Sequence, residues 1–276
     1  MIKKKLNSIS LSSWVFLILL VVLAYIPIVM MINISFRSNG QIYTSFWALP
    51  SPWIWENYTK AFNEIAINIF NSVVVCSIAT IGVTLLSSLS GFVFSRLIFP
   101  GKEIIYYLIL SLMMIPAILT LIPLFIQVSS YGLLNNWLAL LLPWISGGQV
   151  FGIILCRTFL SALPNELFEC ARIDGASEFR IYLRLVLPLL MPVLITLAVV
   201  NLVGNYNDFV WPLLAINNHS SQMVTVALSQ LGVENGTTNY GTRMAGYVLS
   251  TIPLILVFIF GMKYYISGIT SGAVKG

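Results

Sequence analysis

The sequence predicts an all-α integral membrane protein with six transmembrane helices. Three observations support this fold class. The 276 residues are 58% hydrophobic and 8% charged, and the mean hydropathy is +0.93, whereas soluble domains carry roughly 25% charged residues. Several long stretches contain no charged residue, and the basic residues gather on alternate connecting segments. This composition excludes a soluble fold of this size and a disordered chain.

Charge-free runs locate the spans, because a charge at the bilayer centre costs roughly 2.5–3.5 kcal/mol. The five main runs are 31, 31, 53, 23 and 19 residues long. A helix of the third length would extend ~80 Å at ~1.5 Å per residue, more than twice the ~30 Å hydrocarbon core. That run must therefore fold back, at the polar segment 129–136. The predicted spans are 13–35, 68–94, 104–128, 137–160, 187–211 and 244–264.

Two further stretches need a separate interpretation. The apolar run after Met1–Lys5 is too long for a signal-peptide core and lacks a small-residue cleavage site, so we interpret it as an uncleaved first span. The run between Asp208 and Glu234 is uncharged but contains the polar stretch 217–222. We expect a loop there, with room for a short helix around Val224–Leu231.

The distribution of basic residues predicts the orientation. With the N-terminus inside, eleven Lys and Arg residues fall on inner segments and three on outer segments. This asymmetry follows the positive-inside rule. Both termini are therefore expected in the cytoplasm. Trp47, Trp53, Trp55, Trp137 and Trp211 lie near predicted outer boundaries, as in an aromatic belt.

The inner segment 163–188 is too charged to lie in the membrane and too patterned to be a plain tether. Residues 165–173 are typical of a short amphipathic helix. Gly175 can adopt a positive φ in a turn, and Ser177 can cap a second helix. The second helix carries an apolar stripe at i, i+3, i+4 and i+7, formed by Phe179, Tyr182, Leu183 and Val186. These apolar faces could lie on the membrane surface, on the helix bundle or on a partner.

The motif in this segment resembles the EAA loop of ATP-binding-cassette (ABC) importer permeases. Glu169-Cys170-Ala171-Arg172-Ile173-Asp174-Gly175 is followed, after nine residues, by Leu185-Val186-Leu187-Pro188. The family pattern is EAA, three residues, G, nine residues and I-x-L-P. Cys170 replaces the usual Ala and Leu185 the usual Ile. Residues 163–188 are called the EAA loop below.

Other motifs are similar to those of the maltose-type sugar permeases, and in particular of their shorter, MalG-like subunit. They are Asn57-Tyr58, Asn71-Ser72, 91–96 with 99–102, 206–213 and the C-terminal residues 268–276. Tyr206 stands where this group has Trp. The resemblance covers nearly the whole chain. It implies the type I ABC importer (MetI-like) permease fold with cytosolic EAA coupling helices.

The resemblance also implies a function and partners. The chain would be a multi-pass permease subunit of a bacterial inner membrane, forming with a MalF-like permease the path for a sugar or oligosaccharide. An extracytoplasmic binding protein would deliver the sugar, and two ABC ATPase subunits would bind ATP and Mg²⁺. The chain has no G-x-x-x-x-G-K-[ST] motif. We therefore expect no catalytic residue, enzymatic activity or cofactor in it, and no nucleic-acid partner.

Metal and disulfide chemistry are not expected either. Cys76, Cys156 and Cys170 lie singly along the sequence and form no CxxC pair. The only histidine, His219, lies in an outer loop, which argues against an intramembrane hydrolase.

The resemblance assigns three groups of site residues. The ATPase-coupling residues are Glu166, Glu169, Ala171, Asp174, Gly175, Ala176, Ser177, Leu187 and Pro188. An irregular C-terminal tail would reach the ATPases through Gly268, Thr270, Gly272 and Lys275. A flexible polar loop would contact the binding protein through Asn235, Gly236, Thr237 and Tyr240.

A candidate substrate path follows from the residues themselves. Polar side chains in a membrane helix are costly and usually face protein or water. Asn201, Asn205, Asn207 and Asp208 lie on or beside the fifth span. They could bind sugar hydroxyls, or they could pack against another span or the partner permease.

We expect three parts in the chain. Residues 1–66 would form the cytosolic tip, the first span and an outer loop, 67–266 the five-helix importer core, and 267–276 the cytosolic tail.

Two alternatives stay open for the substrate and the energy source. The same importer class could carry glycerol phosphate or another small polar solute. Glycerol phosphate permeases share the pattern, but a phosphorylated ligand would favour Arg or Lys in the path, and none lies mid-span. An ion-coupled secondary transporter would need ionisable groups within the membrane, often with internal repeats. Asp208 is the only candidate for such a group.

Overall fold

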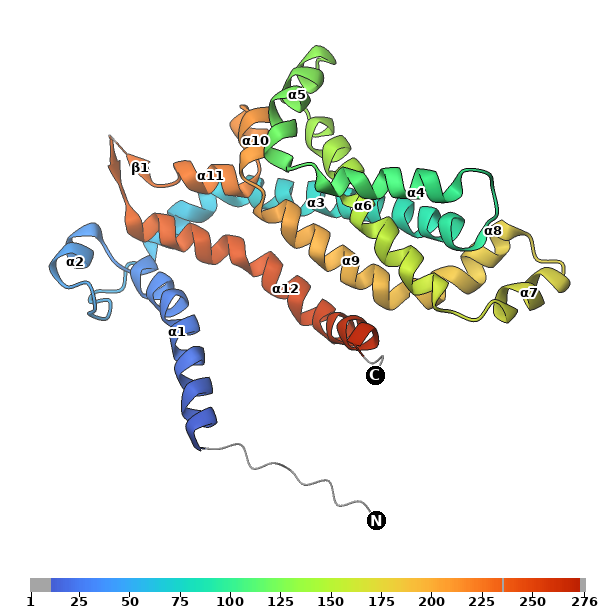
Figure 1. Ribbon diagram of the computed structural model, residues 1–276. Coiled ribbons are helices and arrows are strands. Elements are labelled where there is room, and N and C mark those ends of the chain that lie inside the picture. The colour runs from blue at the N-terminus through green and yellow to red at the C-terminus, as the bar shows by residue number, and fades with distance from the viewer. Residues whose placement is uncertain (1–10, 235, 274–276) are drawn as a thin grey trace. The chain divides into compact units, whose positions relative to one another are not determined.

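The computed structural model describes residues 11–234 and 236–273. The chain divides into two compact units. Unit 1 comprises the chain up to Ala66 together with Gln230–Thr251, and unit 2 comprises Ile67–Ser229 and the residues from Ile252 onward. The helices α3 (Glu56–Arg96) and α12 (Tyr240–Ala273) each contribute residues to both units (Figure 1).

The predicted fold class is confirmed. Among the described residues, five helices are long and apolar enough to cross a membrane, and a bent helix pair brings the number of candidate spans to six. The remaining elements are α1 (Leu11–Ser35), α2 (Asn39–Thr44), α4 (Lys102–Ser111), the 3-10 turn η1 (Leu112–Met114), α5 (Ala117–Ser130), α6 (Leu138–Ser161), α7 (Glu166–Ile173), α8 (Glu178–Ile181), the π-helical turn η2 (Tyr182–Val186), α9 (Leu187–Asn207), α10 (Val210–Ala215), the 3-10 turn η3 (His219–Ser221), α11 (Val224–Gln230), β1 (Val233–Glu234) and β2 (Thr237–Thr238).

The third span is not the single helix that we expected over 104–128. The helices on either side of Pro116 meet at an angle of 100°. Ile115 has extended backbone angles, with φ −82° and ψ 115°. A residue that precedes proline is pushed out of the helical region by the proline ring, and Pro116 has no N–H to continue the helix. The proline therefore breaks the span.

The limits of the fifth span also differ from the prediction. We expected the helix to reach residue 211, but α9 ends at Asn207 and Asp208 is extended, with φ −65° and ψ 125°. At its other end, the second helix of the EAA loop is not separate from the span. α8, η2 and α9 form one helical run, Glu178–Asn207.

The short helix expected around Val224–Leu231 is found as α11. Val224, Val226 and Ala227 are buried. This helix therefore packs inside the chain and does not lie on a membrane surface.

Unit 1 is organised around the side chain of Arg37, which is 1% exposed. Its guanidinium donates hydrogen bonds to the carbonyl oxygens of Phe46 at 2.8 Å and Ser45 at 2.6 Å. Asn57, from the Asn57-Tyr58 motif, in turn donates to the carbonyl oxygen of Arg37 at 3.0 Å. These bonds close the loop after α1 onto the start of α3.

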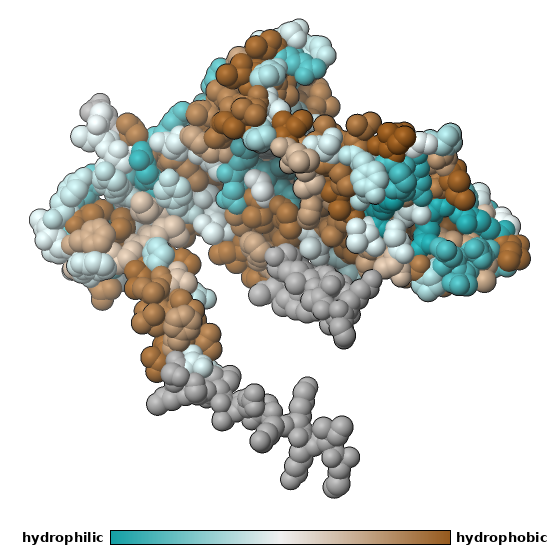
Figure 2. Space-filling view, viewed as in Figure 1, coloured by the Kyte–Doolittle hydropathy of each residue, from teal (hydrophilic) through white to brown (hydrophobic). Residues whose placement is uncertain are grey.

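α1 presents an apolar surface along its length. None of its most hydrophobic 18-residue window is buried within the chain, and Figure 2 shows this helix as a hydrophobic rod. Backbone polar groups within a helix are satisfied internally, so such a surface is stable against lipid tails or another apolar helix.

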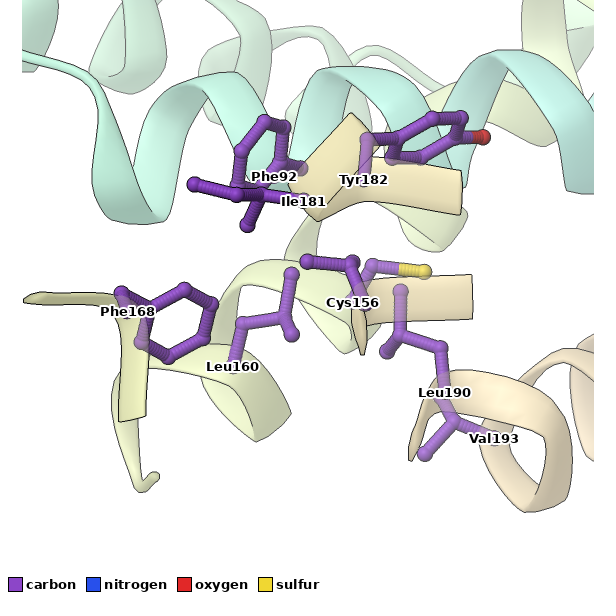
Figure 3. Close-up of a cluster of buried hydrophobic side chains, with 9 residues drawn as sticks. Phe92, Cys156, Leu160, Phe168, Ile181, Tyr182, Leu190 and Val193 are labelled. Carbon is purple, nitrogen blue, oxygen red and sulfur yellow. The ribbon is translucent and has the colours of Figure 1, made fainter. Parts of the chain in front are cut away.

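The core of unit 2 joins α3, α6, α7, α8, η2 and α9. Figure 3 shows Phe168 of α7 beside Leu160 of α6, and Ile181 beside Phe92 of α3. The buried cluster comprises Phe92, Cys156, Leu160, Phe168, Ile181, Tyr182, Val186, Leu190 and Val193. The EAA loop therefore shares its hydrophobic core with the spans.

Small residues let the spans of unit 2 approach closely. A Cβ at Gly91 of α3 would overlap Cβ of Cys156 and lie 3.1 Å from the backbone nitrogen of Arg157 in α6. A Cβ at Gly152 of α6 would overlap the hydroxyl of Ser87. Small residues at such positions are the usual means by which membrane helices pack.

Candidate functional site

The first helix of the EAA loop is found as α7 and ends in a Schellman motif. The N–H of Ala176 donates to the carbonyl oxygen of Ala171 at 3.0 Å, and the N–H of Gly175 donates to that of Arg172 at 3.0 Å. Gly175 has φ +76°, and nothing lies within 4 Å of the position of a Cβ. The motif requires this left-handed conformation, which glycine adopts without strain.

The start of α8 is held by a side-chain cap and an ion pair. The Ser177 hydroxyl accepts a hydrogen bond from the N–H of Arg180 at 3.4 Å, as expected for a helix cap. Arg172 Nε lies 2.7 Å from Glu178 Oε1 across the turn. The hydrogen bond to Glu178 raises the pKa of the Arg172 guanidinium. Both contacts fix the angle between α7 and α8.

Phe168 attaches α7 to the bundle. Its side chain is 1% exposed, and the Arg96 guanidinium lies 4.1 Å from the centre of its ring. Arg96 also donates to the carbonyl oxygen of Leu163 at 2.8 Å, and to the carbonyl oxygen of Leu160 and the Asn165 side chain. One side chain at the end of α3 therefore joins the ends of α6 and α7.

The outer surface of the EAA loop carries most of the expected coupling residues. Glu166, Glu169, Asp174, Gly175, Ser177 and Pro188 are exposed. Large apolar side chains share this surface, with exposures of 84% for Ile173 and 68% for Phe179. Ala171, Ala176 and Leu187 are instead partly buried against the core cluster of this chain. Figure 2 shows hydrophilic side chains gathered at this end of unit 2.

The apolar stripe predicted for the second helix is half wrong. Tyr182 and Val186 are buried, but Phe179 and Leu183 are exposed, and Ile181 is buried in their place. The cause is the π-helical turn Tyr182–Val186. A π turn brings residues five apart onto one face, so Ile181 and Val186 point to the core together.

The four residues of the candidate substrate path do not form one open cluster. The Asn201 amide donates to the carbonyl oxygen of Leu197 at 3.0 Å, and that of Asn207 to Val203 at 2.8 Å. Asn205 Nδ2 is buried and has no hydrogen-bond partner in the described part of the chain. Of the four, only Asn207 is exposed, next to a turn of α9 that carries Gly204.

Asp208 has a structural role at the end of α9. Its Oδ2 accepts a hydrogen bond from the indole of Trp144 at 2.9 Å, and its Oδ1 accepts one from the N–H of Trp211 at 3.3 Å. Its carbonyl oxygen accepts from the Thr225 hydroxyl at 2.7 Å. Asp208 therefore starts α10 and joins it to α6 and α11.

Two amide side chains of α3 hold the turn η3, which follows α10, through hydrogen bonds. Asn68 donates to the carbonyl oxygen of His219 at 2.9 Å, and Asn71 donates to that of Ser220 at 2.8 Å. The Ser72 hydroxyl accepts from the N–H of Val224 at 2.8 Å and so caps α11. Asn71-Ser72 stands out in the sequence as a motif, whereas the only signal for Asn68 is its place one helical turn before Asn71.

The expected binding-protein loop is a hairpin in unit 1. Antiparallel pairing joins Val233 with Thr238 and Glu234 with Thr237, and Gly236 has φ +77°. Asn39 holds this hairpin by donating to the carbonyl oxygen of Thr238 at 2.7 Å. Thr237 and Tyr240 are exposed, as a contact surface requires. Asn235 lies outside the described residues.

The C-terminal tail is not irregular over its described part. α12 continues to Ala273, so the backbones of Gly268, Thr270 and Gly272 are helical. Lys275 lies outside the described residues.

Comparisons with known proteins are consistent across sequence and structure. The family model for the binding-protein-dependent transport system inner membrane component matches residues 84–271. The diacetylchitobiose uptake system permease protein NgcG of Streptomyces coelicolor is 30% identical, covering 94% of this chain and 87% of the relative. The trehalose/maltose transport system permease protein MalG of Thermococcus litoralis is 30% identical over 94% of both chains.

A solved structure shows the same fold. It is a crystal structure of a bacterial ABC transporter involved in the import of the acidic polysaccharide alginate. The TM-score is 0.80 at 22% identity, and the match covers 93% of this chain and 98% of the solved chain.

Proposed function

Because the chain belongs to the family of binding-protein-dependent transport system inner membrane components, we propose that it forms, with a second permease, the membrane path of an ABC importer for a sugar or oligosaccharide. An extracytoplasmic binding protein delivers the sugar, and two ABC ATPase subunits supply the energy. ATP and Mg²⁺ are held by those subunits, and this chain is the mechanical component.

The EAA loop is the observation that carries this proposal. Its inner side is fixed to α3 and α6 through Phe168 and Arg96, whereas its outer side exposes acidic and apolar residues together. A surface of this kind suits a docking helix, because large exposed apolar side chains mark protein contacts. Movement of an ATPase that holds α7 would act directly on α3 and α6.

A second permease is supported by the bent pair α4–α5. Met114, Ile118 and Ile122 are 84%, 72% and 70% exposed around and after the bend at Pro116. A straight apolar helix can be surrounded by lipid alone, because its backbone hydrogen bonds are internal. At a break, the backbone N–H and C=O groups that lose these bonds need protein or water as hydrogen-bond partners within the membrane. We assign this surface to the partner permease and the water-filled path that the two subunits enclose.

The substrate class is proposed from two independent points. NgcG and MalG are named for the transport of neutral sugars, and no Lys or Arg lies in the middle of α6 or α9. The open face of α9 at Gly204 and Asn207 offers an amide for sugar hydroxyls. Glycerol phosphate would need cations that this chain does not place there.

Co-purification tests the proposal. The tagged chain is extracted in mild detergent, and the subunits that co-purify are identified by mass spectrometry. We expect a second permease and an ABC ATPase, with a sugar-binding protein in the same preparation. A chain that purifies alone and transports sugar in liposomes without ATP would contradict the proposal.

The exposed cysteine of α7 allows the docking site to be tested without any substitution. Cys76 and Cys156 are 1% and 0% exposed, and Cys170 is exposed. A water-soluble maleimide should therefore label Cys170 alone. We expect labelling in inside-out vesicles but not in intact cells, because the EAA loop is cytoplasmic.

Removal of the peripheral ATPase should raise this labelling several-fold, since α7 is then uncovered. Labelling of intact cells would overturn the orientation. Equal labelling before and after removal of the ATPase would overturn the docking role of α7.

A further inference from the structure

A pocket of about 250 Å³ lies beside α7, between this helix and the loop 97–101 that joins α3 to α4. Phe168 and Glu169 of α7 line one side. Arg96, Lys102 and Ile98 line the other, and Arg172 completes the wall. The pocket therefore adjoins the EAA loop but is built largely from a different segment of the chain.

The wall of this pocket is positively charged. Three of its residues are cationic, and Glu169 is its only acidic residue. Lys102 Nζ donates to the carbonyl oxygen of Leu97 at 3.0 Å, and the hydrogen bonds of Arg96 within the described residues go to neutral oxygens. Within residues 11–234 and 236–273, neither Arg96 nor Lys102 forms an ion pair. The chain itself thus leaves positive charge at the pocket uncompensated.

Ile98 stands at the rim of the pocket with its side chain wholly exposed, at 100%. Ile173, which follows the pocket residue Arg172 in α7, is also exposed, at 84%. Charged residues on both sides, Arg96 and Lys102, place the loop in water and not in the hydrocarbon core. An exposed apolar side chain beside a charged pocket is the combination found at protein interfaces, where apolar contacts are bordered by ionic ones.

We propose that this pocket is a second attachment point for the ATPase, which receives an acidic side chain of that subunit while Ile98 packs on its surface. The inference rests on the proposed function, because the ATPase must already dock on α7. It adds a contact on the α3–α4 loop, and the charge of the pocket determines the chemistry of the partner residue. A carboxylate would pair with Lys102 and with the unpaired charge of Arg96.

Cysteine protection distinguishes this contact from the docking of α7. Ile98→Cys is made in a Cys170→Ala chain and compared with the native chain in inside-out vesicles, using a polyethylene-glycol maleimide. We expect bound ATPase to slow the labelling of both sites several-fold relative to vesicles stripped of the ATPase. The Cys170→Ala chain without the new cysteine gives the background.

Each other outcome of this experiment counts against the pocket. If Cys170 is protected and the cysteine at 98 is not, the second attachment is wrong and the proposed function stands. If neither is protected, both fail. If the cysteine at 98 stays unlabelled after the ATPase is stripped, the loop lies in the membrane and cannot bind a soluble subunit.

Charge at the pocket is tested by Lys102→Gln and Lys102→Arg. We expect Lys102→Gln to weaken retention of the ATPase by about tenfold, as the loss of one charge-assisted contact would. Lys102→Arg should retain it. Lys60→Gln is the matched control, because Lys60 pairs with Glu56 in unit 1.

If the Lys102→Gln chain retains the ATPase as well as the wild type does, and its melting temperature is unchanged, the pocket does not bind an acidic side chain of the ATPase. If the wild-type chain retains the ATPase equally well at low and at high salt, the acidic partner is also ruled out, because salt screens ionic contacts.

Discussion

Replacement of Gly175 by valine is expected to abolish coupled ATP hydrolysis while the chain still inserts into the membrane. Gly175 ends α7 with φ +76°. A β-branched residue held in this conformation costs roughly 1–3 kcal/mol, so α7 would unwind or turn away from α8. Nothing lies within 4 Å of the added Cβ, and the effect is therefore conformational. Binding-protein-stimulated ATP hydrolysis by the assembled complex is the measurement.

Two variants separate this effect from general strain. Gly175→Asn should retain most of the coupling, because asparagine tolerates the left-handed conformation. Gly132→Val introduces the same strain at φ +65° in a turn with equally open space, far from the EAA loop in sequence, and should leave coupling intact. If Gly175→Val couples as well as the wild type, the geometry of the turn does not position α7.

Replacement of Gly91 by alanine is expected to cause a large loss of stability. The new Cβ would overlap Cys156 and press on the backbone of α6 at Arg157. Backbone cannot move aside as a side chain can, and overpacking typically costs 1–3 kcal/mol. For a chain of this size the melting temperature in detergent should fall by roughly 2–10 °C. Intrinsic fluorescence during heating provides the measurement.

Gly147→Ala is the matched control for this variant. Gly147 also lies in a spanning helix, but nothing lies within 4 Å of its Cβ position. Alanine favours the helix over glycine by about 1 kcal/mol, so this variant should melt at the same temperature as the wild type or higher. The two substitutions are chemically identical and should act in opposite directions. Equal changes would show that α3 and α6 do not meet closely.

The spans and the EAA loop could be predicted because their causes are local. The cost of charge in a bilayer limits where a helix can cross, and the spacing from Glu169 to Gly175 marks the turn at which α7 ends. The family could also be predicted from the sequence, since its motifs extend over most of the chain. These features need no knowledge of what lies far away in the sequence.

The remaining features depend on contacts between distant residues. The bend at Pro116 could have been suspected, but proline is also accommodated within helices here, at Pro143 of α6. The π turn at Tyr182 follows from packing against Phe92 and Ser88, which no local pattern reveals. The hydrogen bond from the Trp144 indole to Asp208 likewise joins residues that are 64 apart in the sequence, which no local pattern reveals.

The division of the chain between two units sets an order for its biosynthesis. The part of unit 1 up to Ala66 is made before unit 2, but Gln230–Thr251, which complete unit 1, emerge from the ribosome much later. The hydrogen bond from Asn39 to Thr238 joins residues 199 apart, and the hydrogen bond from Thr242 to Asn57 joins residues 185 apart. Neither bond can form until the later residue has been made. The uninterrupted stretch Ile67–Ser229 can assemble in the meantime. The part of unit 1 before Ile67 can thus be completed only after Gln230–Thr251 have been made, and a chain released before Gln230 would keep the buried cluster from Phe92 to Val193 but leave both units unfinished.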